Sequence, residues 1–230
     1  MINEYVERVV NLIPEDSHRL YQISYKDACD LVLSGDPEAV SQIDGSYALL
    51  AKEGKTVRMA RSLDRPMRYF LAKREEGPAL IVADRMDTIK EWLVQEGFED
   101  QFHPSYTRMV PAHYVVEIQL IGCPDPDPIY KRFFDPQKNT QSSNLEKIGR
   151  QYIGALAEEI AKWISTVPSK EPIGVCFSGG IDSGAVFLTT QQVMQSMGAQ
   201  LSRLKAFTLN FGNGEDLTQA QAFMKQTNNS

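Results

Sequence analysis

The stretch Ser178-Gly179-Gly180-Ile181-Asp182-Ser183-Gly184 decides the fold of the C-terminal part of the chain. It directly follows the apolar run Ile173-Gly174-Val175-Cys176-Phe177, which has the length and composition of a buried β-strand. The glycines permit a tight turn and a close approach of the backbone to a ligand, and a helix can begin near Asp182. This order of strand, glycine turn and helix points backbone N–H groups and the positive end of a helix dipole at one spot, where an anion can bind.

Side chains of the same stretch can add to such an anion site. Ser178 and Ser183 offer hydroxyl donors, and Asp182 can cap the helix or help to hold a magnesium ion. No lysine follows the glycines, so the stretch differs from the ordinary phosphate loop, whose lysine reaches the β- and γ-phosphates. The alternative interpretation is a glycine turn that only joins a strand to a helix.

The six residues from Ser178 to Ser183 resemble the pyrophosphate-binding loop of the ATP pyrophosphatases. Members of that family cleave ATP to AMP and pyrophosphate while they adenylate a carboxylate or carbonyl oxygen. The resemblance implies ATP and Mg²⁺ as cofactors, with Asp182 as the metal ligand. Leu209 matches a small apolar residue whose backbone contacts adenine in the family, and an ordinary core leucine is an equal alternative. The implied nucleotide-binding residues are Phe177, Ser178, Gly179, Gly180, Ile181, Asp182, Ser183 and Leu209.

Composition narrows the class of protein and its partners. The 230 residues suffice for one or two domains, and 42% hydrophobic with 23% charged residues is typical of a soluble globular protein. A net charge of −6 without a basic cluster argues against nucleic acid as the main partner. No apolar run approaches the ~20 residues that span a bilayer, and the N-terminus lacks signal-peptide features, so no membrane partner is expected. Since Cys29, Cys123 and Cys176 form no CxxC pair, we expect a cytoplasmic protein.

The first half of the chain predicts an α+β domain over residues 1–121, built around antiparallel strands. Apolar residues near helical spacing predict helices over 5–13 and 26–33, and Asp87 is expected to cap a short helix that ends at Leu93. Short β-type runs separated by turn sequences predict an antiparallel meander. These runs are residues 47–51, 57–60, 68–72 and 79–83, and a further strand is expected over 114–121.

This half also resembles the N-terminal glutaminase domain of asparagine synthases. Residues 43–49 (IDGSYAL), 60–70 (ARSLDRPMRYF) and 110–114 (VPAHY) follow the pattern of that domain in the same order. The family's nucleophile is an N-terminal cysteine exposed after loss of the initiator methionine, whereas position 2 here is Ile2. Cys29 is expected to lie on an amphipathic helix and to pack into the protein core, and is not expected to act as a nucleophile. We therefore expect a shortened, degenerate glutamine amidotransferase-like domain that serves as a scaffold and lacks glutaminase activity.

The second half predicts the start of an α/β domain with a parallel sheet, similar to the adenine nucleotide alpha hydrolases, over residues 144–230. A proline-rich linker over 122–143 precedes it. The expected elements are a helix over 144–167 capped by Asn144, strands over 173–177 and 204–210 that are parallel to each other, and helices over 182–197 and 216–226. The first helix carries an apolar stripe expected to pack on the sheet, namely Leu145, Ile148, Tyr152, Leu156, Ile160 and Trp163.

Taken together, the two resemblances imply an ATP-dependent amide ligase of asparagine synthase type. It would adenylate a carboxylate, with aspartate as the parent substrate, release pyrophosphate, and let ammonia or an amine capture the acyl group. The alternative is a non-catalytic ATP-binding subunit or truncated remnant. RNA thiolation, another chemistry of the superfamily, needs paired cysteines and a basic face, which the sequence lacks. The part from Asn144 onward is shorter than the about 100–150 residues of a common domain, so we expect a fragment, a remnant, or a chain completed by a partner chain or by homo-oligomerisation.

Overall fold

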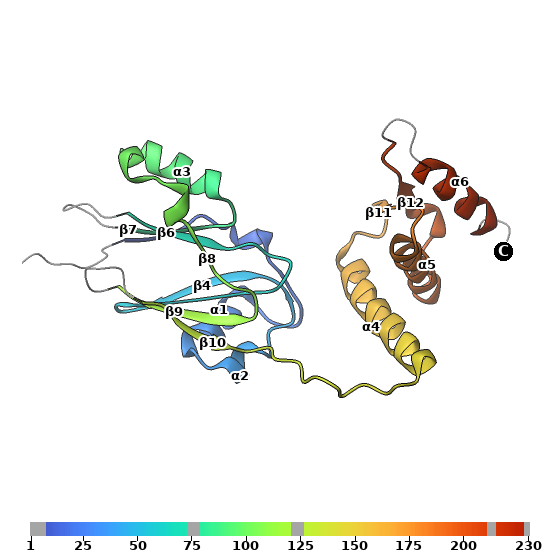
Figure 1. The fold of residues 1–230 in the computed structure, drawn as a ribbon, viewed down its shortest axis with the longest axis horizontal. Coiled ribbons are helices and arrows are strands. Elements are labelled where there is room, and N and C mark those ends of the chain that lie inside the picture. Colours follow the sequence, from blue (N-terminus) through green and yellow to red (C-terminus); the bar gives the residue numbers. More distant parts are fainter. Residues whose placement is uncertain (1–7, 73–78, 121–126, 211–214, 228–230) are drawn as a thin grey trace, which may run out of the picture. The chain divides into compact units, whose positions relative to one another are not determined.

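The computed structural model describes residues 8–72, 79–120, 127–210 and 215–227 (Figure 1). The chain divides into two compact units, Met1–Gln137 (unit 1) and Lys138–Ser230 (unit 2). Both units mix helices and strands, so the α/β character expected from the sequence is confirmed. Ile2 and Cys123, which entered the sequence argument, lie outside the described residues.

Unit 1 is a four-layer sandwich of two sheets between helices (Figure 1). Among the described residues, one sheet has the strand order β1-β7-β6-β8 and the other the order β10-β9-β5-β4. The strands of the first sheet are β1 (Arg8–Asn11), β7 (Ala79–Ala83), β6 (Arg68–Ala72) and β8 (Arg108–Met109). Those of the second are β10 (Ile129–Arg132), β9 (Tyr114–Gln119), β5 (Thr56–Arg61) and β4 (Ala48–Glu53), while β2 (Arg19–Leu20) pairs separately with β3 (Gly45–Ser46).

Three apolar clusters hold these layers together. The cluster between the sheets joins β5 and β9 to β6 and β7, with Met59, Val116, Tyr69 and Leu80 among its members. Helix α1 (Tyr25–Ser34) covers the outer face of the second sheet, together with the short helix α2 (Pro37–Val40). Helix α3 (Met86–Gln95) covers the outer face of the first. Because every residue of β7 is buried, this strand is covered on both faces.

The predicted antiparallel meander is wrong in its connectivity, although each of its strands is present. β4 pairs with β5 and β6 pairs with β7, both antiparallel, but β5 and β6 belong to different sheets. The chain crosses from one sheet to the other between Arg61 and Arg68. Arg61 lies buried at this crossing and donates to the carbonyl oxygens of Val110, Ser62, Leu63 and Arg65. The turn sequence Asp64-Arg65-Pro66 therefore links two layers and not two paired strands.

The helix predicted over residues 5–13 is also wrong where the structure describes it. Arg8–Asn11 forms strand β1, which pairs in parallel with β7 and places Val9 beside Leu80 and Val10 beside Ile81. Val9 and Val10 lie in a short apolar run whose spacing is compatible with a helix or with a strand. Because both residues are β-branched, they favour the strand where a neighbouring strand is available for pairing. The pairing with β7 therefore determines that this segment is a strand and not a helix.

The helices of unit 1 follow local signals closely. α1 begins after Ser24, whose hydroxyl accepts from the Asp27 N–H, and it ends at Gly35 in the left-handed conformation. The φ of +67° at Gly35 favours glycine, and a Cβ there would also displace the Arg58 side chain, whose Nε would lie 2.6 Å away. Asp87 does not cap α3: the cap position is Arg85, without a side-chain cap bond, and Asp87 forms an ion pair with Arg85.

The range expected as a linker, 122–143, contains a strand. Ile129–Arg132 forms β10, which pairs antiparallel with β9 at the edge of the second sheet. Four residues free of proline and glycine, Ile-Tyr-Lys-Arg, lie between the prolines of the segment, and they are long enough to form an edge strand. The boundary between the two compact units falls after Gln137 in the sequence.

Among its described residues, unit 2 contains a parallel strand pair and three α-helices. Its elements are α4 (Leu145–Thr166), β11 (Ile173–Cys176), α5 (Ile181–Ser196), β12 (Leu204–Phe207) and α6 (Asp216–Thr227). β11 and β12 are parallel, with Ile173 beside Leu204 and Val175 beside Ala206, as the sequence predicted. Asn144 caps α4 by accepting from the Lys147 N–H, which confirms that prediction.

The apolar stripe of α4 is only partly core. Ile160 and Trp163 pack with Ile173 and Val193 next to the strand pair, whereas Leu145 and Tyr152 are 83% and 65% exposed. The prediction that the whole stripe packs on the sheet is therefore wrong for its N-terminal part. Periodicity shows which face of a helix is apolar, but it does not show how far along the helix a partner extends.

The described helices were also compared with the dimensions of a bilayer. Within residues 8–72, 79–120, 127–210 and 215–227, none of them combines the length and apolar character required to cross a membrane.

Candidate functional site

The loop from Phe177 to Ser183 leaves the carboxyl end of β11 and enters α5. Phe177 is buried, and its N–H donates to the Phe207 carbonyl over 2.8 Å. The Thr208 hydroxyl donates to the Phe177 carbonyl, also over 2.8 Å. These two bonds fix the start of the loop to the end of β12. The loop therefore lies at the carboxyl ends of both parallel strands, where open α/β sheets bind ligands.

Gly179 makes the turn possible for two reasons. Its φ of +82° lies in the left-handed region that side chains disfavour. A Cβ at this position would also lie 2.9 Å from the Ala220 backbone nitrogen and 2.9 Å from Gln219 Cβ, both on α6. The sequence predicted the positive φ, whereas the packing of α6 against the glycine appears only in the fold.

The two serines of the loop brace it internally. Ser178 Oγ and Ser183 Oγ lie 3.2 Å apart. Ser183 Oγ also accepts from the Ser178 N–H and donates to the Gly180 carbonyl, while Ser178 Oγ accepts from the Gly180 N–H. The sequence predicted hydroxyl donors for a ligand, and the structure adds a second role: the hydroxyls hold the loop in shape without a ligand.

The N-terminus of α5 presents backbone amides without protein acceptors. Gly180 occupies the cap position and offers no side-chain cap, and the first helical bond runs from the Gly184 N–H to the Gly180 carbonyl. The N–H groups of Ile181, Asp182 and Ser183 have no hydrogen-bond acceptor in the part of the chain that the structure describes. Such a helix end attracts anions, because its N–H groups and its dipole are both positive.

Asp182 lies exposed in the first turn of α5 and does not cap the helix, so that part of its prediction is wrong. The described residues contain no group of three or more histidine, cysteine, aspartate or glutamate side chains that could hold a metal ion. If Asp182 binds a cation, ligand oxygens must complete the coordination. This requirement suits magnesium, which protein sites commonly bind through one or two carboxylates together with phosphate oxygens.

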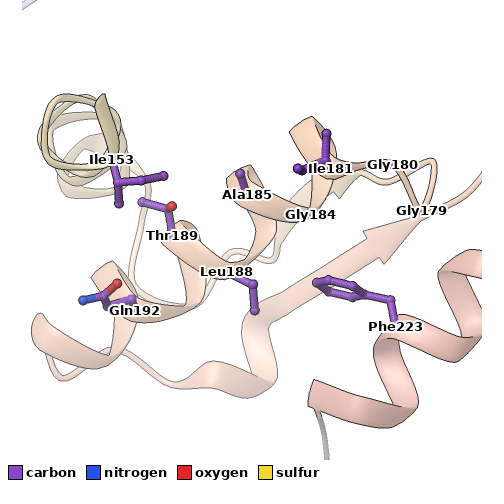
Figure 2. Close-up of a pocket in the computed structure, with 10 residues that line it drawn as sticks. All are labelled: Ile153, Gly179, Gly180, Ile181, Gly184, Ala185, Leu188, Thr189, Gln192 and Phe223. Atoms are coloured by element: carbon purple, nitrogen blue, oxygen red, sulfur yellow. The ribbon is translucent and has the colours of Figure 1, made fainter. Parts of the chain in front are cut away.

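A cavity of about 450 Å³ opens beside the loop, as Figure 2 shows. Its walls come from the loop, from one face of α5, from Ile153 on α4 and from Phe223 on α6. The remaining lining residues of α5 are Gly184, Ala185, Leu188, Thr189 and Gln192, and the loop contributes Gly179, Gly180 and Ile181. None of these lining residues carries a charge.

A second cavity of about 450 Å³ lies at the end of β12, between the strand and α6. Phe177, Ala206 and Thr208 line it on the strand side, while Leu217, Met224 and Lys225 belong to α6. It is mostly apolar and has one cationic side chain. Phe177, the first residue of the loop, is thus also part of the lining of this cavity.

The structure brings most of the predicted site residues together, with one exception. Residues 177–183 form one continuous loop, but Leu209 is 76% exposed and lines neither cavity. The position of Thr208 directly after the second parallel strand predicts that it lies near the loop, and its hydroxyl does donate to the Phe177 carbonyl. Sequence reasoning missed Phe223, which approaches the loop from α6 and carries no local sequence signal.

Comparison with known families supports the interpretation of unit 2 and is silent on unit 1. Residues 164–229 match the family model "Asparagine synthase", which covers less than a third of the chain and includes β11, the loop, α5, β12 and α6. None of the curated proteins compared matches the chain. The C-terminal part of the chain is thus similar to an asparagine synthase-like family, and this similarity suggests an ATP-dependent amide ligase.

Proposed function

We propose that unit 2 binds the diphosphate part of ATP on the loop from Phe177 to Ser183. On this basis the protein acts in an ATP-dependent amide ligation that forms AMP and pyrophosphate. The observation that carries the proposal is the set of N–H groups of Ile181, Asp182 and Ser183 at the carboxyl end of a parallel strand, which have no acceptor among the residues that the structure describes. The match to the asparagine synthase family spans this loop and supports the same chemistry.

The loop suits a diphosphate because it is organised before the ligand arrives. The contacts between Ser178, Gly180 and Ser183 hold its backbone, and α6 supports it at Gly179. Preorganised donors stabilise developing charge without reorganisation of the protein. The apolar cavity beside Phe177 and Thr208 is the proposed place of the nucleoside, because it adjoins the loop at the end of the second strand.

In the proposed reaction a substrate carboxylate oxygen attacks the α-phosphorus, and the bond to the bridging oxygen of pyrophosphate breaks. The loop amides hold the departing pyrophosphate as its negative charge grows. Ammonia or an amine then attacks the acyl carbon, AMP leaves with the electron pair of the acyl–oxygen bond, and the nitrogen loses a proton. Asp182 is the residue proposed to help hold magnesium, which when bound would neutralise phosphate charge.

We propose that unit 1 is a scaffold without glutaminase activity. Of the two cysteines that the structure describes, Cys29 lies in α1 against the core, half-buried beside Tyr25. Burial is the main cause that raises the pKa of the Cys29 thiol, and the charges of Asp30 and Glu15 act in the same direction. A thiol held protonated is a poor nucleophile toward an amide. Free ammonia or an amine is accordingly the proposed nitrogen source.

A second candidate function is nucleotide binding without catalysis by this chain alone. The observation that favours it is the absence of any charged side chain among the residues that line the loop cavity. Recognition of an acidic substrate such as aspartate normally uses a cationic group. Under this alternative a partner chain, or a second copy of this chain, would supply the missing groups.

Two measurements on the full chain separate these functions. Calorimetric titration with a non-hydrolysable ATP analogue and magnesium is expected to show binding that the Asp182→Ala variant weakens. Exchange of labelled pyrophosphate into ATP, in the presence of aspartate or other carboxylates, then reports adenylation. Binding with exchange supports the ligase, binding without exchange supports the nucleotide-binding subunit, and no binding refutes the proposed site.

A further inference from the structure

Unit 1 contains a small cavity that the proposed ATP chemistry does not use. Its volume is about 190 Å³, roughly six times the ~30 Å³ that one water molecule occupies in the liquid. Four aromatic side chains line it, namely Tyr47, His113, Phe133 and Phe134. The other lining residues are Asp44, which supplies a carboxylate, Ser41 and Ser62, which supply hydroxyls, Ile43 and Gly45.

The fold gathers these rings by fixing His113 in an uncommon conformation. His113 has a φ of +64°, in the left-handed region that few residues other than glycine adopt. Its N–H donates to the Arg61 carbonyl over 3.2 Å, and its carbonyl accepts from the Phe133 N–H over 2.9 Å. The His113 ring centroid consequently lies 5.9 Å from that of Phe133 and 4.7 Å from that of Phe134.

Backbone conformations of this kind are strained and persist where the surrounding structure imposes them. Here the imposed conformation turns an imidazole toward two phenylalanine rings at the end of β10. Tyr47 is the buried residue among the four: it is only 2% exposed, and its N–H donates to the Ser62 hydroxyl over 2.9 Å. The cavity is thus lined by aromatic rings, and backbone hydrogen bonds fix the positions of His113, Phe133 and Tyr47.

Asp44 contributes a carboxylate to the lining, and no lysine or arginine side chain is among the described lining residues. Arg61, whose guanidinium donates to the Ser62 carbonyl, lies close by but does not line the cavity. The Ser62 hydroxyl also lies 2.6 Å from the Asp64 carboxylate, immediately outside the lining. Arg132, near Phe134, has its guanidinium engaged by the Phe134 carbonyl and by Asp135, both at 2.9 Å.

We propose that this cavity, the unit 1 aromatic cavity, binds a methylated ammonium group. Aromatic faces attract cations through their quadrupole, most strongly where the cation is desolvated, and a carboxylate adds a counter-charge. A bulky, weakly hydrated cation of this kind matches a cavity that is too small for a typical organic cofactor, whose site has about 300–1,000 Å³. A bare metal ion would need several oxygen ligands, which a ring-lined cavity does not offer.

Two sources present this chemistry: a small free molecule such as choline, or a methylated lysine side chain of another protein. The proposal concerns unit 1 alone and does not rest on ATP binding by unit 2. Its test is a titration of the ¹⁵N-labelled full chain, followed by the amide shifts of residues around the cavity. The probes are choline, its uncharged analogue 3,3-dimethylbutan-1-ol, a trimethyl-lysine peptide and the unmodified peptide.

The variants are matched for exposure. Phe134→Ala removes a ring of the cavity that is 50% exposed, and Tyr130→Ala removes a ring on β10 that is 49% exposed and does not line it. Asp44→Asn removes the charge and keeps the shape. We expect choline to shift amides around the cavity, Phe134→Ala and Asp44→Asn each to weaken its binding about three- to thirtyfold, and Tyr130→Ala to leave it unchanged.

Each of the other possible results either overturns or supports binding of an ammonium group in this cavity. Equal binding of the uncharged analogue, equal loss in Tyr130→Ala, or no shift with any ammonium probe would overturn the proposal. Preference for the trimethyl-lysine peptide over choline would support it with a protein partner as the source, and preference for choline would support it with a small molecule as the source.

Discussion

Replacement of Gly179 by alanine tests the geometry of the loop in unit 2. An alanine at a φ of +82° raises the energy of the folded loop by about 1–2 kcal/mol. Its Cβ would also meet the Ala220 backbone nitrogen and Gln219 Cβ at 2.9 Å each, closer than real Cβ contacts. Since one neighbour is helix backbone, α6 or the loop must shift, which costs about 1–3 kcal/mol in a packed region.

We therefore expect Gly179→Ala to destabilise the packing of the loop and α6 by about 2–5 kcal/mol. Displacement of the loop can release a large part of this strain. Nucleotide binding must then return the loop to its original conformation, which costs free energy. Affinity for an ATP analogue should fall at least tenfold, the equivalent of about 1.4 kcal/mol. Hydrogen exchange of α5 and α6 amides in the full chain measures the first effect, and calorimetry measures the second.

The matched control is Gly154→Ala. Gly154 lies within α4, and an added Cβ would meet nothing within 4 Å. Alanine in a helix is more stable than glycine by about 0.5–1 kcal/mol, so this variant should protect α4 slightly and leave nucleotide affinity unchanged. Native exchange in α6 together with native affinity in Gly179→Ala would refute the account of the loop.

Three further predictions concern single side chains. Asp182→Asn should weaken binding of an ATP analogue with magnesium much more than binding without it, and an equal loss under both conditions in calorimetry would exclude Asp182 as a metal ligand. Burial, assisted by the charge of Arg65, lowers the pKa of His18 below 6.5. As the pH falls below 6.5, His18 therefore binds a proton more readily in the unfolded chain than in the folded one. The free energy of unfolding of unit 1 should consequently fall by up to about 1.4 kcal/mol per pH unit in this range. Denaturant unfolding at two pH values measures this slope, and the same slope in His18→Gln would assign it elsewhere. Asn144→Ala removes the cap that accepts from the Lys147 N–H, and it should raise exchange in the first turn of α4 at a cost of about 1 kcal/mol; unchanged protection there would contradict the cap.

Local signals in the sequence predicted the part of the fold that carries the candidate site. The run ending at Phe177, the two glycines and the helix that follows are adjacent in the chain, so their geometry is set by neighbouring residues. The cap at Asn144 and the helix stop at Gly35 are local in the same sense. Where competing local patterns were equally good, as at Val9 and Val10, the pairing with β7 decided between strand and helix.

The features that could not be predicted depend on contacts between distant residues. The position of α6 against Gly179 joins parts of the chain about forty residues apart, and no local pattern encodes it. The crossing between the sheets after Arg61 resembles an ordinary turn in sequence. The cavity beside His113 depends on a strand, β10, in a segment that looked like a linker. Aromatic residues scattered along a sequence give no sign that a fold will bring them together.

The most direct test of the account is a pyrophosphate titration, with magnesium, of the ¹⁵N-labelled full chain. The amides of Ile181, Asp182 and Ser183 should shift downfield together and saturate at one affinity, because each gains a charged acceptor and none of the described residues provides one. Unmoved amides at these three positions, with the loop otherwise intact, would contradict the claim that this helix end binds a diphosphate.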